Sequence, residues 1–448
     1  MNAASTAPTQ TNATSLAWGR RAAASIAGGV VSLNRKVEPA IAFVRARGSR
    51  LTDADGREYI DYHGAFAPHL LGHNDPGINA AVAEAMSQEW SLMGSGTTPW
   101  EVELAEALRA AVPSMELVQI TNTGSEATAH AIRLARAWTG REDIIVTLGG
   151  YNGAHNDVAR TVSPALCDIG PRVSPGTYPF LPLSAGIPKS VRDRVHVVNF
   201  NDLPSVERLL ATGNIACVLT EPVLQNIGVV PPLPGYLQGL RTMCDRHGTI
   251  LAFDEVKTGF RSALGGYQSI AGVRPDLSTF GKAVANGYPL GVIGGRADIM
   301  GLFDAADPAR RVLVSGTYNA HPLPTAAAIA TLARLRRGDG EVYRHLDMLG
   351  SALEQGLSRI FAESGITAAI SRIGSAFCVY FCDHVPVDYH DLATHHDHER
   401  DRRFRRGLIE RGIYVFPLPC KQGSISYAHS AEDIDRTLDA ARAVAKSL

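Results

Sequence analysis

The stretch IACVLTEPVLQNIGVVPPLPGYLQGLRTMCDRHGTILAFDEV, residues 215–256, contains two apolar runs on either side of a helical pattern. The runs at 215–223 and 249–256 are rich in β-branched residues, which is typical of buried strands. The segment between them, 235–248, has helical spacing and ends at Gly248, where a helix commonly closes. A strand–helix–strand unit of this kind predicts two parallel strands, and therefore an α/β fold.

The same alternation continues toward the N-terminus. A helix is predicted after TNTGSEAT (121–128), ending at Gly140. Further buried strands are predicted at ELVQI (116–120), DIIVTL (143–148) and RVHVVNF (194–200). Repeated strand–helix alternation predicts a mainly parallel sheet.

The two ends of the chain have a different pattern. Residues 41–62 alternate apolar and polar around an Asp-Ala-Asp-Gly turn, which predicts a hairpin. After residue 330 we expect a long helix, short strands at 376–381 and 412–417, and a last helix from Ala431, with a hinge near 337–340. The predicted organisation is a disordered tail (1–17), an N-terminal segment joining the small domain (18–75), a large domain (76–332) and a C-terminal small α+β domain (333–448).

Composition narrows the class of protein. The chain has 448 residues, of which 45% are hydrophobic and 19% charged, and 43 basic residues balance 44 acidic ones. This balance favours neither nucleic acid nor an anionic membrane as a partner. No apolar run approaches the ~18–20 residues that span a bilayer. The polar N-terminus lacks a secretory signal and the six cysteines are scattered, so we expect a cytoplasmic protein with reduced thiols.

Four histidines crowd YHDLATHHDHERD (389–401), which we interpret as a solvated loop without a metal. The basic run that follows, 402–406, predicts a helix with a charged outer face.

Functional groups are expected at the carboxyl ends of parallel strands, and four such positions carry unusual residues. Gly124 and Ser125 open a predicted helix, where backbone N–H groups favour an anion, although Ser125 could instead cap the helix. Asp254 ends an apolar strand, so its carboxylate needs a partner. Tyr151 follows two glycines, which let its ring approach a flat ligand. Lys282, in FGKAVANGYPLG (280–291), lies among small residues that let a bulky group approach its amine.

Together these groups fit pyridoxal phosphate. Lys282 would form an imine with the aldehyde, and Asp254 would keep the ring nitrogen protonated, so that the ring accepts electrons. Nucleotide sites fit less well. The sequence contains no G-x-G-x-x-G, and Gly281-Lys282-Ala283 lacks the glycine and the Ser/Thr of a Walker motif.

From about residue 18 to its end, the chain resembles the class III pyridoxal-phosphate aminotransferases of fold type I, in particular the branch containing glutamate-1-semialdehyde 2,1-aminomutase. The motifs that carry the resemblance occur in family order: NTGSEAT (122–128), LGGYNG (148–153), TEPVLQNIGVVPP (220–232), LAFDEVKTGFR (251–261), FGKAVANGYPLG (280–291) and SGTYNAHP (315–322).

The resemblance implies roles for individual residues. Gly124 and Ser125 would hold the phosphate, Tyr151 would stack on the ring, Asp254 would pair with the ring nitrogen and Lys282 would carry the imine. Glu221 and Asn226 would orient the phenolic side of the cofactor. Gly316 and Thr317 would reach the phosphate of a neighbouring subunit, which implies a homodimer with shared sites. Ser32 and Arg35 match the serine that binds the substrate and the arginine that binds its carboxylate.

The chain departs from the aminomutase branch around the substrate. Asn152 stands where the branch usually has histidine, and Phe66 replaces a tryptophan. Leu148 and Lys421 stand where the aminomutase has glutamates. The predicted substrate-binding residues are therefore Ser32, Arg35, Phe66, Leu148, Asn152 and Lys421.

These features predict an aminotransferase that moves an amino group from an amino acid with an apolar body, including β- or D-amino acids, to a keto acid. The alternatives are glutamate-1-semialdehyde 2,1-aminomutase, a racemase or epimerase, and a non-catalytic regulatory protein with the same fold.

Overall fold

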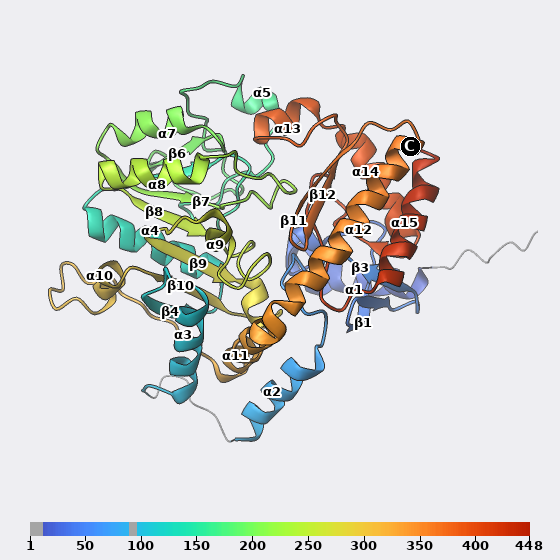
Figure 1. Ribbon diagram of the computed structural model, residues 1–448, viewed down its shortest axis with the longest axis horizontal. Helices are drawn as coiled ribbons and strands as arrows, with labels where there is room; N and C mark the ends of the chain where they lie inside the picture. The colour runs from blue at the N-terminus through green and yellow to red at the C-terminus, as the bar shows by residue number, and fades with distance from the viewer. Residues whose placement is uncertain (1–11, 89–95) are drawn as a thin grey trace, which may run out of the picture.

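The computed structural model describes residues 12–88 and 96–448. Within these residues the large sheet has seven strands in the order β4-β10-β9-β8-β7-β5-β6 (Figure 1). Their bounds are β4 Leu117–Thr121, β5 Asp143–Thr147, β6 Val195–Val198, β7 Ile215–Thr220, β8 Ile250–Asp254, β9 Leu277–Gly281 and β10 Gly291–Gly295. β5 pairs in parallel with β6 and β7, β7 with β8, and β8 with β9, whereas β10 runs antiparallel to β4 and β9. The predicted α/β fold with a mainly parallel sheet is confirmed.

Helices follow the strands as the alternation predicts. α4 packs against β7 to β10, and α8 packs against β8 and α7. α4 ends before Gly140 and α8 before Gly248, and both glycines have the left-handed conformation that closes a helix. The helices of the first three quarters of the chain are α1 Ala13–Ser25, α2 Pro76–Ser87, α3 Pro99–Ala111, α4 Gly124–Thr139, α5 Leu166–Ile169, α6 Lys189–Arg192, α7 Leu203–Leu210, α8 Tyr236–His247, α9 Tyr267–Ala271, α10 Ala297–Met300 and α11 Pro322–Arg336.

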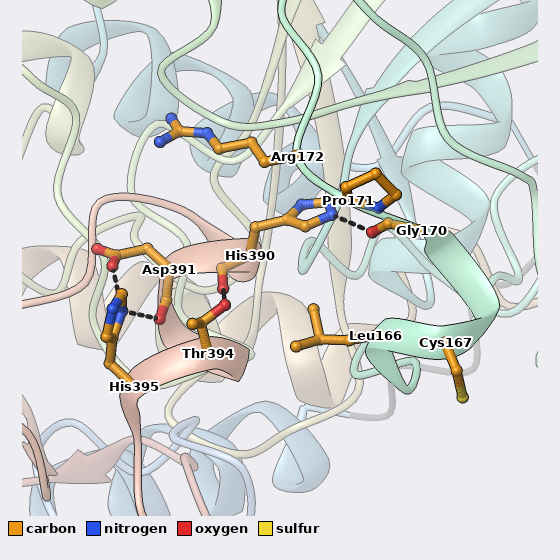
Figure 2. A pocket seen from close by; sticks show the side chains of 9 residues that line it. All are labelled: Leu166, Cys167, Gly170, Pro171, Arg172, His390, Asp391, Thr394 and His395. Atoms are coloured by element: carbon orange, nitrogen blue, oxygen red, sulfur yellow. Dashed lines mark hydrogen bonds and ion pairs between the residues drawn. The ribbon is translucent and has the colours of Figure 1, made fainter.

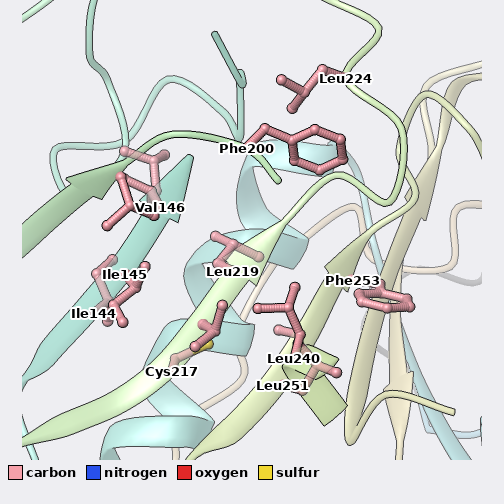
Figure 3. Close-up of a cluster of buried hydrophobic side chains, with 14 of the residues drawn as sticks. Ile144, Ile145, Val146, Phe200, Cys217, Leu219, Leu224, Leu240, Leu251 and Phe253 are labelled. Atoms are coloured by element: carbon pink, nitrogen blue, oxygen red, sulfur yellow. The ribbon is translucent and has the colours of Figure 1, made fainter. Parts of the chain in front are cut away.

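The sheet core is apolar along whole strands rather than on alternate positions, since helices and loops cover both of its faces. Every residue of β7 and β8 is buried. Figure 3 shows this core, in which Leu219 of β7 and Leu251 of β8 lie near Leu240 of α8. This buried packing therefore holds the carboxyl ends of β7 and β8 in place in the fold.

Both ends of the chain build the second lobe. The strands β1 Phe43–Arg47, β2 Arg50–Asp53 and β3 Glu58–Asp61 form an antiparallel meander, and β13 Ile413–Tyr414 pairs in parallel with β3. The predicted hairpin is thus the β2–β3 part of a larger sheet. A second small sheet contains β11 Ala369–Ile373, β12 Ala376–Tyr380 and β14 Gly423–Ser424. The helices here are α12 Glu341–Glu363, α13 Tyr389–His395, α14 His398–Glu410 and α15 Ala431–Ala445.

The prediction of a disordered tail through residue 17 is wrong for residues 13–17, which begin helix α1. The N–H groups of Thr14 and Ser15 donate to the carboxylate of Asp55 at 2.8 and 2.9 Å. The turn between β2 and β3 thereby caps the helix across about 40 residues of sequence. Residues 1–11 lie outside the described residues.

The domain limits predicted from the sequence remain predictions, with one adjustment. The limit at 332/333 falls inside α11, which continues to Arg336. Residues 338–340, between α11 and α12, all have positive φ, so the chain turns there. Among the described residues, no helix combines the length and apolarity needed to cross a membrane.

Candidate active site

A cavity of about 160 Å³ lies at the carboxyl ends of β5, β7, β8 and β9. Seven of the nine residues predicted to bind the cofactor line it; Gly316 and Thr317 do not. The described lining residues are Gly124, Ser125, Tyr151, Asn152, Gly153, Glu221, Asn226, Asp254, Val256, Lys257 and Lys282. Parallel strands bring these positions together because their carboxyl ends share one edge of the sheet.

One end of the cavity is the N-terminus of α4. Thr123 caps this helix by accepting from the N–H of Glu126 at 3.2 Å, so Ser125 is not its cap. The first intrahelical hydrogen bond here runs from the N–H of Ala127 to the oxygen of Thr123. The N–H groups of Gly124 and Ser125 therefore precede the hydrogen-bonded turns and can bind an anion, with the helix dipole favouring it.

Close packing explains the glycines at this end. A Cβ on Gly124 would lie 2.7 Å from both γ-carbons of Val256, and one on Gly281 would lie 3.3 Å from its Cγ1. A Cβ on Gly153 would lie 3.0 Å from the Cα of Ser125. Small residues are thus needed for the start of α4, the end of β9 and the loop after β5 to converge on the cavity.

Asp254, the last residue of β8, is 3% exposed. Its Oδ1 accepts from the N–H of Val256 at 3.1 Å and from the hydroxyl of Thr279 at 3.2 Å, and its Oδ2 accepts from Nδ2 of Asn152 at 2.8 Å. Burial raises the pKa of Asp254, while these hydrogen bonds and the charge of Lys282 oppose the rise. A cationic group in the cavity would stabilise the ionised carboxylate further.

Asn152 was predicted to bind substrate, but its side chain is 2% exposed and bonds to Asp254. Its Oδ1 accepts from Nη2 of Arg160 at 3.1 Å, and that guanidinium also donates to the oxygen of Thr147. We therefore assign Asn152 as a positioning residue for Asp254, held in turn by the buried Arg160.

Asn152→Ala is expected to slow turnover about tenfold, since a hydrogen bond to a charged group contributes about 1.5–3 kcal/mol and 1.4 kcal/mol is tenfold in rate. The Asn152 hydrogen bond lowers the pKa of Asp254. Its loss should raise that pKa and move the acid limb of the pH–rate profile to higher pH. Asn199, an equally buried amide that bonds Tyr178 and His390, provides the control. If Asn199→Ala shifts the profile as much, the assignment is wrong.

Lys282 follows β9 and has a φ of 47°, in the left-handed region that costs a non-glycine residue about 1–3 kcal/mol. Such strain is typical of a functional position. Burial lowers the pKa of Lys282, whereas the charges of Asp254 and Glu221 oppose this. A lowered pKa increases the fraction of neutral amine, which is the form that attacks a carbonyl and accepts a proton.

Glu221 organises the side of the cavity after β7. It is 1% exposed and accepts from the N–H of Tyr151 at 2.9 Å, from Nδ2 of Asn226 at 2.9 Å and from the N–H of Gln225 at 3.0 Å. Burial, followed by the negative charge of Asp254, raises the pKa of Glu221. Glu221 thus fixes both Tyr151 and Asn226, which line the cavity.

The predicted substrate residues are only partly brought together. Lys421 reaches the loop after β7, where its ammonium donates to the oxygen of Asn226 at 2.7 Å. Leu148 is 2% exposed in the hydrophobic core and is absent from the cavity lining, so its prediction as a substrate residue is wrong. The residue follows a strand, and its side chain turns toward the core. Ser32 and Arg35 lie in the N-terminal segment, and Arg35 lines a separate groove there.

Phe66 belongs to an aromatic cluster with His63 and Phe416. The rings of His63 and Phe416 stack at 4.9 Å, and that of Phe66 lies 4.7 Å from His63. Burial, together with the charges of Lys257 and Arg35, lowers the pKa of His63 to about 4, against the opposing charge of Asp61. Ala67, the residue after Phe66, accepts a hydrogen bond from Arg261, which lies four residues after Lys257.

Gly316 and Thr317 are exposed in the single chain. Their loop is tied back through Asn319, whose Oδ1 accepts from Asn122 at 3.0 Å, two residues before Gly124. Their predicted contact with a neighbouring subunit remains a prediction.

A second cleft, of about 470 Å³, lies between α5 and α13 and shares no lining residue with the first cavity (Figure 2). The expectation of a solvated histidine loop is wrong, because 389–401 forms α13 and the start of α14 and His390 is buried. His390 bonds to Asn199 and to the oxygen of Gly170.

The histidine groups have protein partners. His384 and His395 both bond to Asp391 at 2.9 Å. His396 uses one ring nitrogen for the N–H of Phe381 and the other for Asp401. These contacts give the side chains protein partners. Two sets of side chains nevertheless bring possible ligand atoms within 4.8 Å of one another, namely His384, Asp391 and His395, and His396, His398 and Cys420. The absence of a metal therefore stays a prediction.

Four residues of the site were not singled out from the sequence: Gly153, Val256, Lys257 and Arg160. Val256 and Lys257 come two and three positions after Asp254, so the rule that placed Asp254 at a strand end would have found them. Arg160 lies in a loop without a sequence signal, and only the fold brings it to Asn152.

The cavity fits the expected pyridoxal phosphate. Gly124 and Ser125 offer donors for a phosphate, Asp254 offers a buried carboxylate for the ring nitrogen, and Lys282 offers an amine in the same cavity. Tyr151 and Val256 supply walls for a flat ring. When bound, pyridoxal phosphate supplies a carbonyl that reacts with amines and a ring that accepts electrons from the substrate.

Solved structures resemble this chain over nearly its whole length. An omega-transaminase from Sphaerobacter thermophilus is 30% identical, with a TM-score of 0.87 and 98% of each chain covered. A β-phenylalanine aminotransferase from Variovorax paradoxus is 29% identical, with a TM-score of 0.83 and coverage of 96% of this chain and 93% of that one. A glutamate-1-semialdehyde aminomutase from Pseudomonas aeruginosa PAO1 is 25% identical, with the same TM-score of 0.83 and the same coverage of 96% and 93%.

Residues 32–426 match the sequence model of the aminotransferase class-III family. The match, the fold and the cavity residues agree with the family resemblance noted in the sequence. The chain therefore belongs to the class III aminotransferases and is a pyridoxal-phosphate-dependent enzyme.

Proposed function

We propose that this enzyme transfers an amino group between two separate small molecules, from an amino acid with an apolar body, including β- or D-amino acids, to a keto acid. The observation that carries the proposal is the convergence of Lys282, Asp254 and Tyr151 on one cavity with Lys421 beside it. Lys282 would hold and move the proton at the reacting carbon. Asp254 would hold the proton on the ring nitrogen.

The apolar body is supported by the cluster of His63, Phe66 and Phe416. Aromatic rings of this kind bury an apolar or aromatic side chain through area and ring contacts. The loop that carries Phe66 is hydrogen-bonded through the oxygen of Ala67 to Arg261, four residues after the cavity residue Lys257, which supports placing the cluster near that part of the cavity.

The main alternative is glutamate-1-semialdehyde 2,1-aminomutase, since two of the similar structures are of an enzyme with that name. An aminomutase must retain an intermediate with a second amine, for which an acidic side chain is the natural partner. Lys421 is a cation at a position where the branch has glutamate, and it disfavours a second ammonium. Leu148, the other position where the aminomutase has glutamate, lies in the core and does not bear on this choice. A racemase would share the same cofactor contacts.

We also propose a cytoplasmic homodimer. Exposed Gly316 and Thr317, which the family places at a neighbour's phosphate, support the dimer. The six cysteines are all free in the structure, which is in keeping with a reducing compartment.

Single-substrate reactions followed through the visible absorbance of the bound cofactor test the proposal. β-Phenylalanine, alanine in each configuration and glutamate-1-semialdehyde are each added without an acceptor. We expect an apolar amino acid to convert the cofactor to its amine form, and a keto acid added afterwards to reverse the change. Formation of 5-aminolevulinate from the semialdehyde, with no response to any separate donor, would support the aminomutase instead.

A further inference from the structure

The chain has few lysines, and three of them lie at or beside the active-site cavity. The sequence contains six lysines. Lys257 and Lys282 line the active-site cavity, and Lys421 reaches the loop at its side from the other lobe. The proposed chemistry uses Lys282 and leaves two further cations to be explained.

Lys257 and Lys421 approach the same loop from opposite lobes. The ammonium of Lys257, three residues after β8, donates to the oxygen of Gln225. The ammonium of Lys421, just before β14, donates to the oxygen of Asn226, the next residue. In the part of the chain that the structure describes, neither lysine forms an ion pair. Both ammonium groups therefore donate to uncharged carbonyl oxygens, which belong to two consecutive residues.

A cation removed from water is costly unless an anion pairs with it. Burial, and next the positive charge of Lys282, lower the pKa of Lys257 well below its ordinary value. Burial also lowers the pKa of Lys421. The charge of Glu221 opposes both pKa shifts. Its carboxylate is nevertheless hydrogen-bonded to Tyr151, Gln225 and Asn226, and that of Asp254 to Asn152, rather than to either lysine. An anion entering this part of the cavity would supply a direct partner.

We propose that Lys257, assisted by Lys421, forms the subsite that binds the carboxylate of the amino or keto acid, an assignment that rests on the proposed function. Lys257 and Lys282 line the same cavity, so a carboxylate bound at Lys257 would belong to the molecule whose amine reacts at Lys282. Arg35, which family resemblance suggested for this role, is exposed and lines a groove in the N-terminal segment rather than the cavity.

The subsite implies a specificity. Amines that carry a carboxylate gain a charge-assisted hydrogen bond at Lys257, whereas simple amines leave both lysines unpaired. The enzyme should therefore prefer amino acids to amines of the same size and shape.

The test uses the holoenzyme and an unreactive pair of ligands, 3-phenylpropanoate and its neutral amide, whose dissociation constants are measured by calorimetry. Lys257→Met keeps the length of the side chain and removes its charge. We expect binding of the carboxylate to weaken about tenfold or more while binding of the amide stays the same. Lys257→Arg should retain part of the preference, and Lys421→Met should lose less than Lys257→Met.

Lys189→Met is the matched control, because Lys189 is exposed on α6 and its removal changes the net charge equally. Equal carboxylate affinity in Lys257→Met and wild type would overturn the proposal. So would an equal loss for carboxylate and amide, or loss of the cofactor from Lys257→Met, since these would place Lys257 in packing or in cofactor binding. The two proposals can fail independently. If no donor converts the cofactor but Lys257→Met still loses the preference for the carboxylate over the amide, the proposed function is wrong and the carboxylate subsite stands.

Discussion

Lys282→Ala is expected to abolish the covalent link between protein and cofactor and to reduce turnover by about 10²–10⁴-fold or more, which is the usual contribution of a positioned proton-transfer group. Lys282 lines the same cavity as Asp254 and the anion-binding start of α4, and its strained backbone and lowered pKa suit an amine that reacts. Binding of the cofactor through Gly124 and Ser125 should survive. Mass spectrometry after borohydride reduction measures the link.

Lys189→Ala serves as the control, since it removes an exposed lysine outside the cavity. It should retain the reducible adduct and full activity. If Lys282→Ala formed the adduct at the wild-type level, another lysine would be the attachment point, and Lys257 would be the first to test.

Asp254→Asn is expected to leave the fold intact and to slow proton removal from the substrate about 10²-fold. A hydrogen bond to a charged group contributes about 1.5–3 kcal/mol, and each 1.4 kcal/mol is tenfold in rate. Because the local dielectric is low, we expect the contribution of this hydrogen bond to lie near the upper end of that range. The amide cannot supply the negative charge that keeps a ring nitrogen protonated. Stopped-flow absorbance with a single donor measures the step, and the substrate's deuterium isotope effect identifies it.

The matched control is Asp276→Asn. Asp276 is also buried, and it accepts from the N–H of Leu251 and pairs with Arg241 and Arg296 away from the cavity. That variant should lose stability without slowing the proton step. A rate loss of about twofold or less in Asp254→Asn would remove Asp254 from its role.

The fold was predictable because its buried parallel strands are continuous apolar runs, which a sequence shows directly. Much of the site was predictable because functional groups lie at the carboxyl ends of these strands. Asp254, Tyr151 and Lys282 each come just after such a run, and the ends of parallel strands meet at one edge. The same rule could have predicted Lys257, since it lies three residues beyond Asp254.

Other features depend on contacts between distant residues and carry no local signal. Helix α1 begins at Ala13 because Asp55 caps it from another element. Leu148 and Asn152 lie within five residues of one another after β5, yet one packs in the core and the other bonds Asp254. The direction of a side chain in a loop is set by what surrounds it, and resemblance to a family position does not reveal it.

The most direct test of the central claim is the fate of the amino nitrogen. The enzyme is incubated with β-phenylalanine labelled with ¹⁵N and an unlabelled keto acid, and the products are followed by mass spectrometry. We expect the label to appear in the amino acid formed from the keto acid, in an amount equal to the donor consumed. Label that remains on the carbon skeleton of the donor, at another carbon or at the same carbon with inverted configuration, would contradict transfer between two molecules.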